Sequence, residues 1–265
     1  MTERVDDAGP QVGGCTLAEL VSQADALLGP ARFQDYGPNG LQVEGRTRVR
    51  RLVSGVTASL ALIEAALQAG ADAIVVHHGL FWRGQPGTVT GWMKVRLQRL
   101  LGHDVSLLAY HLPLDAHPEV GNNAQLARRL GFAPQADGWG RFGEQQLGFL
   151  GRSPLADAAA LAAHLAAVLG RAPTWVPGDG RPIHRIAWCS GGAQGYFEAA
   201  IAAGADAFVT GEISEPQAHL ARETGVAFYA CGHHATERYG VAALGEWLAQ
   251  RCGLEHRFID VDNPA

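Results

Sequence analysis

The sequence lacks the features that mark nucleic-acid-binding, secreted or membrane proteins. Lys94 is its single lysine, and 21 basic against 26 acidic residues leave a formal charge of −5, so the chain has no basic surplus of the kind that binds DNA or RNA. No apolar run is long enough to span a bilayer, and the first residues show no signal-peptide pattern. We therefore expect no membrane contact, and the sequence gives no direct support for a nucleic-acid partner.

Cysteine is also scarce and widely spaced. Four cysteines occur without a C-x-x-C pair, at Cys15, Cys189, Cys231 and Cys252. This spacing argues against a thiolate zinc site or a disulfide scaffold, and it fits a reducing cytoplasm. An H-E-x-x-H motif is missing too, which disfavours a metallopeptidase. The 47% of hydrophobic residues is ordinary for a globular protein with a buried core.

What the chain does contain is an internal repeat. The segment Glu64–Ala73 reappears as Glu198–Ala207, with eight of ten positions identical at an offset of 134. A β-branched run precedes each copy and an apolar run follows it, while Gly70 and Gly204 stand where a helix commonly ends. Each copy therefore predicts a strand, a helix and a strand, and the alternation predicts an α/β fold of two similar domains, each a sheet flanked by helices.

The similarity between the halves continues beyond these segments. A short apolar strand is predicted at 105–110 and another at 226–230, and each is followed by a histidine, three residues and an acid. These pairs are His111 with Asp115 and His233 with Glu237. Helices of about 123–130 and 241–252 are expected next. We place the first unit at 15–131, a linking or inserted segment at 132–182 and the second unit at 183–262.

The strongest local signal for a binding site is the pair His77 and His78, which ends the apolar run 73–76 and precedes Gly79. Ligands of α/β folds bind beyond the carboxyl ends of strands. A buried core histidine is the alternative for either residue alone, but an adjacent pair at a strand end favours metal ligands.

Three further residues join this hypothesis. His233 and Glu237 are four positions apart and share a face if the segment is helical; the alternative is a helix-start pair in which Thr236 and Glu237 serve as a cap. Asp115 follows another strand end, where it could equally be a turn aspartate. One dinuclear site in the cleft between the two domains explains all five candidates together: His77, His78, Asp115, His233 and Glu237. Mixed imidazole and carboxylate ligands suit two divalent ions of Zn, Mn, Fe, Co or Ni.

Other segments are weaker candidates. His111 and His234 could carry protons. The turn that contains Gly191, Gly192 and Gly195 could present amides to a phosphate, although a tight strand-to-helix turn is an equally good reading. The polar loop 35–45 could line a pocket or merely connect two elements.

Six blocks carry a resemblance to a known family. They are DYGPNGLQVEG at 35–45, VVHHGLFW at 75–82, YHLPLDAHPEVGNNAQLA at 110–127, SGGAQGYFEAA at 190–200, TGEISE at 210–215 and GHHATERYG at 232–240. In these blocks the chain resembles the Nif-three-like dinuclear-metal proteins, the family of GTP cyclohydrolase I type 2 homologues. The resemblance covers Leu17 to about Ile259.

The resemblance implies the same five metal ligands. It pairs His78 and Asp115 on one ion and His77 and His233 on the other, with Glu237 as the bridge. His111 is not among the family's usual ligands, so we expect it beside the site. The family also implies a ring-shaped homohexamer whose metal sites face an internal cavity.

Two functions follow as hypotheses. The first is a dinuclear metal-dependent hydrolase acting on a small molecule, with a nucleotide as the candidate; a GTP cyclohydrolase would open the imidazole ring of GTP and release formate, with the triphosphate near Gly191 to Gly195. The second is a metal-binding, ring-forming interaction or chaperone-like protein without that activity.

Overall fold

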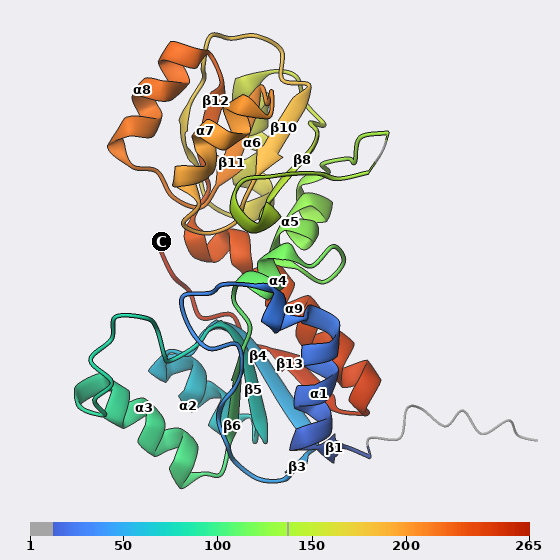
Figure 1. Ribbon diagram of the computed structural model, residues 1–265, viewed down its shortest axis with the longest axis vertical. Helices are drawn as coiled ribbons and strands as arrows, with labels where there is room; N and C mark the ends of the chain where they lie inside the picture. The colour runs from blue at the N-terminus through green and yellow to red at the C-terminus, as the bar shows by residue number, and fades with distance from the viewer. Residues whose placement is uncertain (1–12, 137) are drawn as a thin grey trace, which may run out of the picture.

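Two β-sheets, each covered by helices on both faces, lie at opposite ends of the long axis of the molecule (Figure 1). The computed structural model describes residues 13–136 and 138–265. Within these residues, no helix combines the length and the apolar character needed to cross a membrane. The predicted α/β fold with two sheet-and-helix units is confirmed.

The first sheet has five strands in the order β13, β4, β5, β6, β2. Their bounds are Glu255–Phe258, Arg51–Thr57, Ala73–His78, Ser106–Ala109 and Gly40–Val43. The first four are parallel and β2 is antiparallel to β6. Buried side chains alternate between two apolar layers. One layer is covered by α1 (Leu17–Leu28) and α9 (His233–Cys252), the other by α2 (Leu60–Gln68) and α3 (Gly91–Gly102).

The second sheet has six strands in the order β7, β8, β10, β11, β12, β9. Their bounds are Gly140–Phe142, Gly148–Arg152, Arg185–Trp188, Ala207–Thr210, Ala227–Ala230 and Thr174–Val176. The strands β10, β11 and β12 are parallel, and antiparallel strands flank them on both sides. One face is covered by α5 (Asn122–Leu130) and α6 (Ala158–Leu169), the other by α7 (Phe197–Ala202) and α8 (Glu215–Thr224).

The remaining elements are short. They are β1 (Cys15–Thr16), β3 (Arg48–Val49), α4 (Leu112–Ala116) and the 3-10 turns Pro30–Arg32, Glu144–Gln146 and Gln194–Tyr196.

The repeated segment forms the units that its sequence predicts. The first copy forms β4, α2 and β5, and the second forms β10, α7 and β11. Gly70 and Gly204 follow the two helices with φ of 70° and 76°, a left-handed backbone that glycine adopts without steric cost. The helix α6 begins at Ala158 because the Asp157 side chain accepts the Ala160 N–H and caps it there.

One helix from each half packs on the sheet of the other half. The helix α5 follows a strand of the first sheet, yet it packs on the second, where the Trp188 indole donates to the carbonyl of Asn123 at 2.9 Å. The helix α9 follows a strand of the second sheet, yet Val241, Leu244 and Leu248 pack on the first. The two helices also contact each other. This exchange holds the two sheets on either side of the junction that contains the candidate site.

The sheets cross the predicted domain boundaries at two places. The segment 132–182, expected to link or be inserted, supplies β7, β8 and β9 to the second sheet. The C-terminal strand β13, expected with the second unit, pairs in parallel with β4 of the first. Both differences arise from pairing between segments far apart in the sequence, which local patterns do not record.

Candidate metal site

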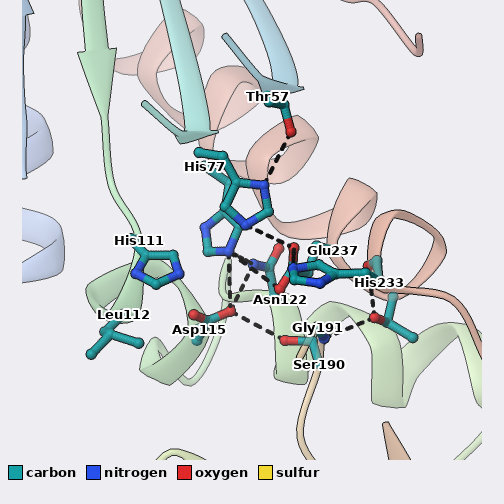
Figure 2. A network of polar contacts seen from close by, with 12 residues as sticks. Thr57, His77, His111, Leu112, Asp115, Asn122, Ser190, Gly191, His233 and Glu237 are labelled. Atoms are coloured by element: carbon teal, nitrogen blue, oxygen red, sulfur yellow. Dashed lines mark hydrogen bonds and ion pairs between the residues drawn. The ribbon is translucent and has the colours of Figure 1, made fainter. Parts of the chain in front are cut away.

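The five predicted ligands converge where strands of both sheets end. Figure 2 labels four of them: His77, Asp115, His233 and Glu237. His77 and His78 are the last residues of β5, and Asp115 lies in α4 after β6. His233 is the first residue of α9, directly after β12, and Glu237 follows one helical turn later. The helix begins eight residues before its predicted start, so His233 and Glu237 do share a helical face.

Glu237 lies at the centre of the cluster, and its two carboxylate oxygens face different partners. Oε1 is 3.5 Å from His77 Nε2, whereas Oε2 is 3.2 Å from His78 Nε2 and 3.1 Å from His233 Nε2. Asp115 Oδ1 is 3.6 Å from His77 Nε2. His77, Asp115 and Glu237 are buried, so these polar groups compensate one another away from bulk water.

Each of the three histidines is held through its other ring nitrogen. Nδ1 of His77 lies 3.0 Å from the carbonyl oxygen of Tyr110, which can only accept, so the ring proton is on Nδ1. Nδ1 of His78 lies 3.1 Å from Thr57 Oγ1, on the neighbouring strand β4. Nδ1 of His233 lies 2.6 Å from Glu212 Oε1. Histidines that bind metals are commonly oriented in this way, with the free nitrogen turned toward the ion.

Asp115 is held by residues of both halves. Its Oδ1 accepts from Asn122 Nδ2 at 2.8 Å and from Ser190 Oγ at 3.1 Å. Asn122 begins α5, and Ser190 follows β10. The carboxylate is therefore fixed at the point where the exchanged helix leaves the first half.

The electrostatics of the cluster follow from its buried carboxylates. Burial alone would lower the pKa of His77, but Asp115 and Glu237 outweigh it and raise that pKa to about 9. Burial likewise opposes protonation of His233, while Glu237 and Glu212 raise its pKa to about 9. Burial dominates at His78 and lowers its pKa to about 3. Burial would raise the pKa of Glu237, yet His77 and His78 hold it well below the usual range. Protons on His77 and His233 therefore supply the positive charge that offsets the ionised Glu237 carboxylate. A bound cation would supply the same charge.

The chemistry of the donor atoms suits a metal ion. Oε2 of Glu237 is buried and lies 3.1–3.2 Å from the Nε2 atoms of His78 and His233, yet it forms a well-aligned hydrogen bond with neither, and a buried carboxylate oxygen is costly to leave without one. Among the described residues, three groups of ligand atoms lie close enough together to share an ion: His77 with Asp115 and Glu237, His78 with His233 and Glu237, and His77 with His78 and His111. In the first two groups His77 lies with Asp115 and His78 lies with His233, whereas the resemblance implies the opposite pairing.

His111 lies beside His77 and His78. Its ring is 4.9 Å from that of His77 and 5.7 Å from that of His78, between centroids. Its Nδ1 is 2.7 Å from Oδ1 of Asp35. Within the loop 35–45, expected only to line a pocket or connect two elements, no local pattern marks Asp35 as the partner of His111. None marks Glu212 as the partner of His233 either, although both residues fall in blocks that carry the family resemblance.

His234 is not brought to the cluster. Its Nε2 lies 2.7 Å from Asp260 Oδ1, in the segment after β13. Successive residues of a helix are turned by about 100°, so the neighbour of His233 faces away from the donors. The predicted cap formed by Thr236 and Glu237 is also not seen: the N-cap is Gly232, and Thr236 Oγ1 accepts the Gly191 N–H at 2.9 Å.

Of the three glycines proposed for phosphate binding, Gly191 has a structural role of its own. The N–H of Gly191 is paired with Thr236, and that of Ser190 is paired with Asn123 Oδ1 at 2.9 Å. A Cβ on Gly191 would meet Oε1 of Glu237, and the backbone there has φ of 68°. Gly191 therefore lets the chain pass close to the carboxylate, whereas Gly192 is exposed and Gly195 has open space around it.

Comparison with known proteins gives a consistent result. The family model Duf34/NIF3 (NGG1p interacting factor 3) matches residues 15–264. A protein named GTP cyclohydrolase 1 type 2 homolog from Pseudomonas aeruginosa is 57% identical over 253 residues, covering 94% of this chain and 98% of that protein. The protein of the same name from Neisseria meningitidis serogroup B is 53% identical over 250 residues, covering 93% and 98%.

Solved structures agree in fold. Protein ybgI, described as of unknown function, has a TM-score of 0.88 at 46% identity, covering 94% of this chain and all 100% of that one. TTHA1606 from Thermus thermophilus has a TM-score of 0.82 at 36% identity, with coverage of 94% and 100%. With a family model that spans nearly the whole chain and relatives of this identity, the chain belongs to the Duf34/NIF3 family.

Proposed function

We propose that this cleft binds two divalent transition-metal ions and that the protein is a metal-dependent hydrolase. The observation that carries the proposal is the orientation of Glu237, whose Oε1 faces His77 and whose Oε2 faces His78 and His233. A carboxylate with one oxygen toward each donor group is suited to bridge two ions. Imidazole and carboxylate ligands together favour Zn, Mn, Fe, Co or Ni over Mg or Ca.

The chemistry that such ions supply is hydrolytic: a pair of bound metals lowers the pKa of water toward neutrality and holds an electrophile in place. The chain's own residues support this use. Asn122 and Ser190 fix Asp115 in position. His111 keeps its Nε2 free, because Asp35 engages Nδ1, and can take or give a proton at that atom.

The finer proposal concerns the substrate. The relatives from Pseudomonas aeruginosa and Neisseria meningitidis are named as homologues of GTP cyclohydrolase 1 type 2. We accordingly propose a small-molecule substrate, with GTP as the first candidate, opened at its imidazole ring with release of formate. The homohexameric ring and the cytoplasmic location remain predictions.

The direct test is to load the purified protein with each candidate metal, add GTP, and follow formate and the change in purine absorbance. We expect formate release that disappears in Glu237→Gln. If GTP stays intact while another substrate in a broad hydrolase panel is turned over, the cyclohydrolase proposal is wrong and the hydrolase proposal stands.

The family description names an interacting factor, which favours the interaction protein as the second candidate. Wild-type protein without turnover across the panel, combined with loss of a partner complex in Glu237→Gln, would support that candidate and contradict the hydrolase.

A further inference from the structure

A cavity of about 190 Å³ opens directly onto the donor cluster. The residues that form its walls include His111, Asp115, His233 and Glu237 of the cluster and two tyrosines, Tyr36 and Tyr196. The lining comes from both halves of the chain. A molecule that reaches the proposed metal ions from this side has to enter this cavity.

The size and charge of the cavity restrict what can enter. Pockets that hold drug-sized ligands have volumes of roughly 300–1,000 Å³, so this one takes a single compact group and not a whole nucleoside triphosphate. Proteins usually recognise phosphate groups with arginine or lysine. Neither residue type is present among the described residues that line the cavity.

The two tyrosines give the walls aromatic faces. The Tyr196 hydroxyl donates to the Glu144 carbonyl at 3.2 Å, and its ring lies against Gly143, where a Cβ would meet the ring carbons. The ring of Tyr36 meets His111 edge-on, with centroids 6.1 Å apart. Its side chain is nevertheless 57% exposed. A large aromatic residue left exposed beside a cluster of metal-binding donors is available to stack on a bound ring.

A pair of hydrogen bonds joins the loop that carries Tyr36 to the turn beside Tyr196. The Gln145 side chain accepts the Gln34 N–H at 2.8 Å and donates to the Gln34 carbonyl at 3.0 Å. Gln34 belongs to the loop that carries Tyr36, and Gln145 lies in the β7–β8 hairpin turn beside Tyr196. Gln145 and Gln146 have φ of 51° and 59°, a left-handed conformation that non-glycine residues adopt at a cost. Among the described residues, Asp104 is the only other non-glycine residue with a positive φ.

We propose that this cavity is a subsite for one uncharged planar heterocycle, such as a purine base, which lies between Tyr36 and Tyr196 with an edge toward the donor cluster. Phosphate groups of a nucleotide stay outside it. The inference rests on the proposed hydrolase function and narrows its substrate class, because recognition then resides in the ring and not in the triphosphate.

The test is isothermal titration of metal-loaded protein with guanosine, GTP and tripolyphosphate. We expect guanosine to bind within about threefold of GTP and tripolyphosphate not to displace it. Tyr196→Ala and Tyr36→Ala each weaken guanosine binding by about tenfold or more, the loss expected for one stacking partner. Tyr196→Phe, which keeps the ring, retains most of the affinity, and Trp92→Ala, an exposed aromatic outside this cavity, changes nothing.

Metal content and thermal melting of each variant separate lost binding from lost folding, and Tyr36→Ala removes little packing because that side chain is exposed. The proposal is overturned if guanosine does not bind, if tripolyphosphate competes with GTP, or if both alanine variants bind guanosine normally. If guanosine binds but no substrate is turned over, the hydrolase proposal is wrong and the ring subsite stands. If an acyclic substrate is turned over and neither Tyr36→Ala nor Tyr196→Ala affects its turnover, the ring subsite is wrong and the hydrolase proposal stands.

Discussion

Nδ1 of His111 lies 2.7 Å from Oδ1 of Asp35, a residue 76 positions earlier in the chain. The same carboxylate accepts the N–H groups of Tyr36 and Leu112 and the side-chain amide of Asn39. Burial would raise the pKa of Asp35, but His111 and these donors lower it to about 2. An ionised carboxylate only accepts, so it keeps the His111 proton on Nδ1 and leaves Nε2 free on the side of the donor cluster.

Asp35→Asn should therefore impair proton transfer without removing the ions. We expect the rate of metal-dependent hydrolysis to fall by about 10- to 100-fold, as for other residues that orient a site group. His111→Gln should lower the rate similarly, and the double variant should be no worse than His111→Gln, because Asp35 acts through His111. Rates and metal content are measured together. Loss of both ions in Asp35→Asn would instead make Asp35 a structural residue of the loop.

Two glutamates near His233 should affect metal binding differently. Glu237 faces both donor groups, whereas Glu212 contacts the cluster only through His233 Nδ1. We expect Glu237→Gln to weaken the binding of both ions and Glu212→Gln to weaken one of them by about 10- to 100-fold. Elemental analysis after dialysis against a weak chelator measures both occupancies. Equal loss in the two variants would argue against a bridging role for Glu237.

The site could be predicted in part because several of its members end local patterns. His77 and His78 follow an apolar strand, and His233 and Glu237 have helical spacing. The partners that orient them could not be found in this way: Asp35 is 76 positions from His111 and Glu212 is 21 from His233. Residues so far apart in the chain do not belong to any periodic pattern that the sequence shows.

The fold, like the site, could be predicted from the sequence only in part. The repeated strand–helix–strand units follow from hydrophobic periodicity. The exchange of α5 and α9 between the sheets does not follow from this periodicity, because no local pattern specifies which sheet each helix covers. The full 20 residues of α9 and the pairing of β13 with β4 depend on that tertiary choice. The sequence also could not show that His234 faces away from the site, because the direction of a side chain is known only once the start of its helix is known.

The pKa values predict opposite effects of pH on the metal-free and metal-bound protein. His77 and His233 have pKa values raised from 6.5 to about 9, so their protonation stabilises the metal-free fold below pH 6.5 and is lost as pH rises through 9. Metal binding needs the neutral rings and releases those protons. We expect the melting temperature of the metal-free protein to fall between pH 6.5 and 9.

Over the same interval the apparent metal affinity should rise, by about tenfold per pH unit for each proton released. Chelator competition gives the affinity, and calorimetry in buffers of different ionisation enthalpy counts the protons. A metal affinity that is flat from pH 6.5 to 8.5 would contradict the assignment of His77 and His233 as ligands.

The crossing of α5 and α9 depends on Gly240. A Cβ at this position would meet the Asn122 side-chain oxygen and lie 2.6 Å from the Asn122 backbone nitrogen. Because that neighbour is backbone, Gly240→Ala should force the helices apart and lower the free energy of unfolding by about 1–3 kcal/mol. It should also weaken metal binding, since Asn122 holds Asp115. Gly102→Ala is the matched control, as no atom lies within 4 Å of a Cβ there.

Urea unfolding, followed by far-ultraviolet circular dichroism, distinguishes the two variants. Gly102 lies in α3, so alanine there should leave stability unchanged or raise it slightly. Because each sheet is covered by a helix from the other half, wild type and both variants should unfold in one transition, with the midpoint displaced only in Gly240→Ala. Two separate transitions would mean that the exchanged helices do not couple the halves, and the metal site would then lie between independently folding units.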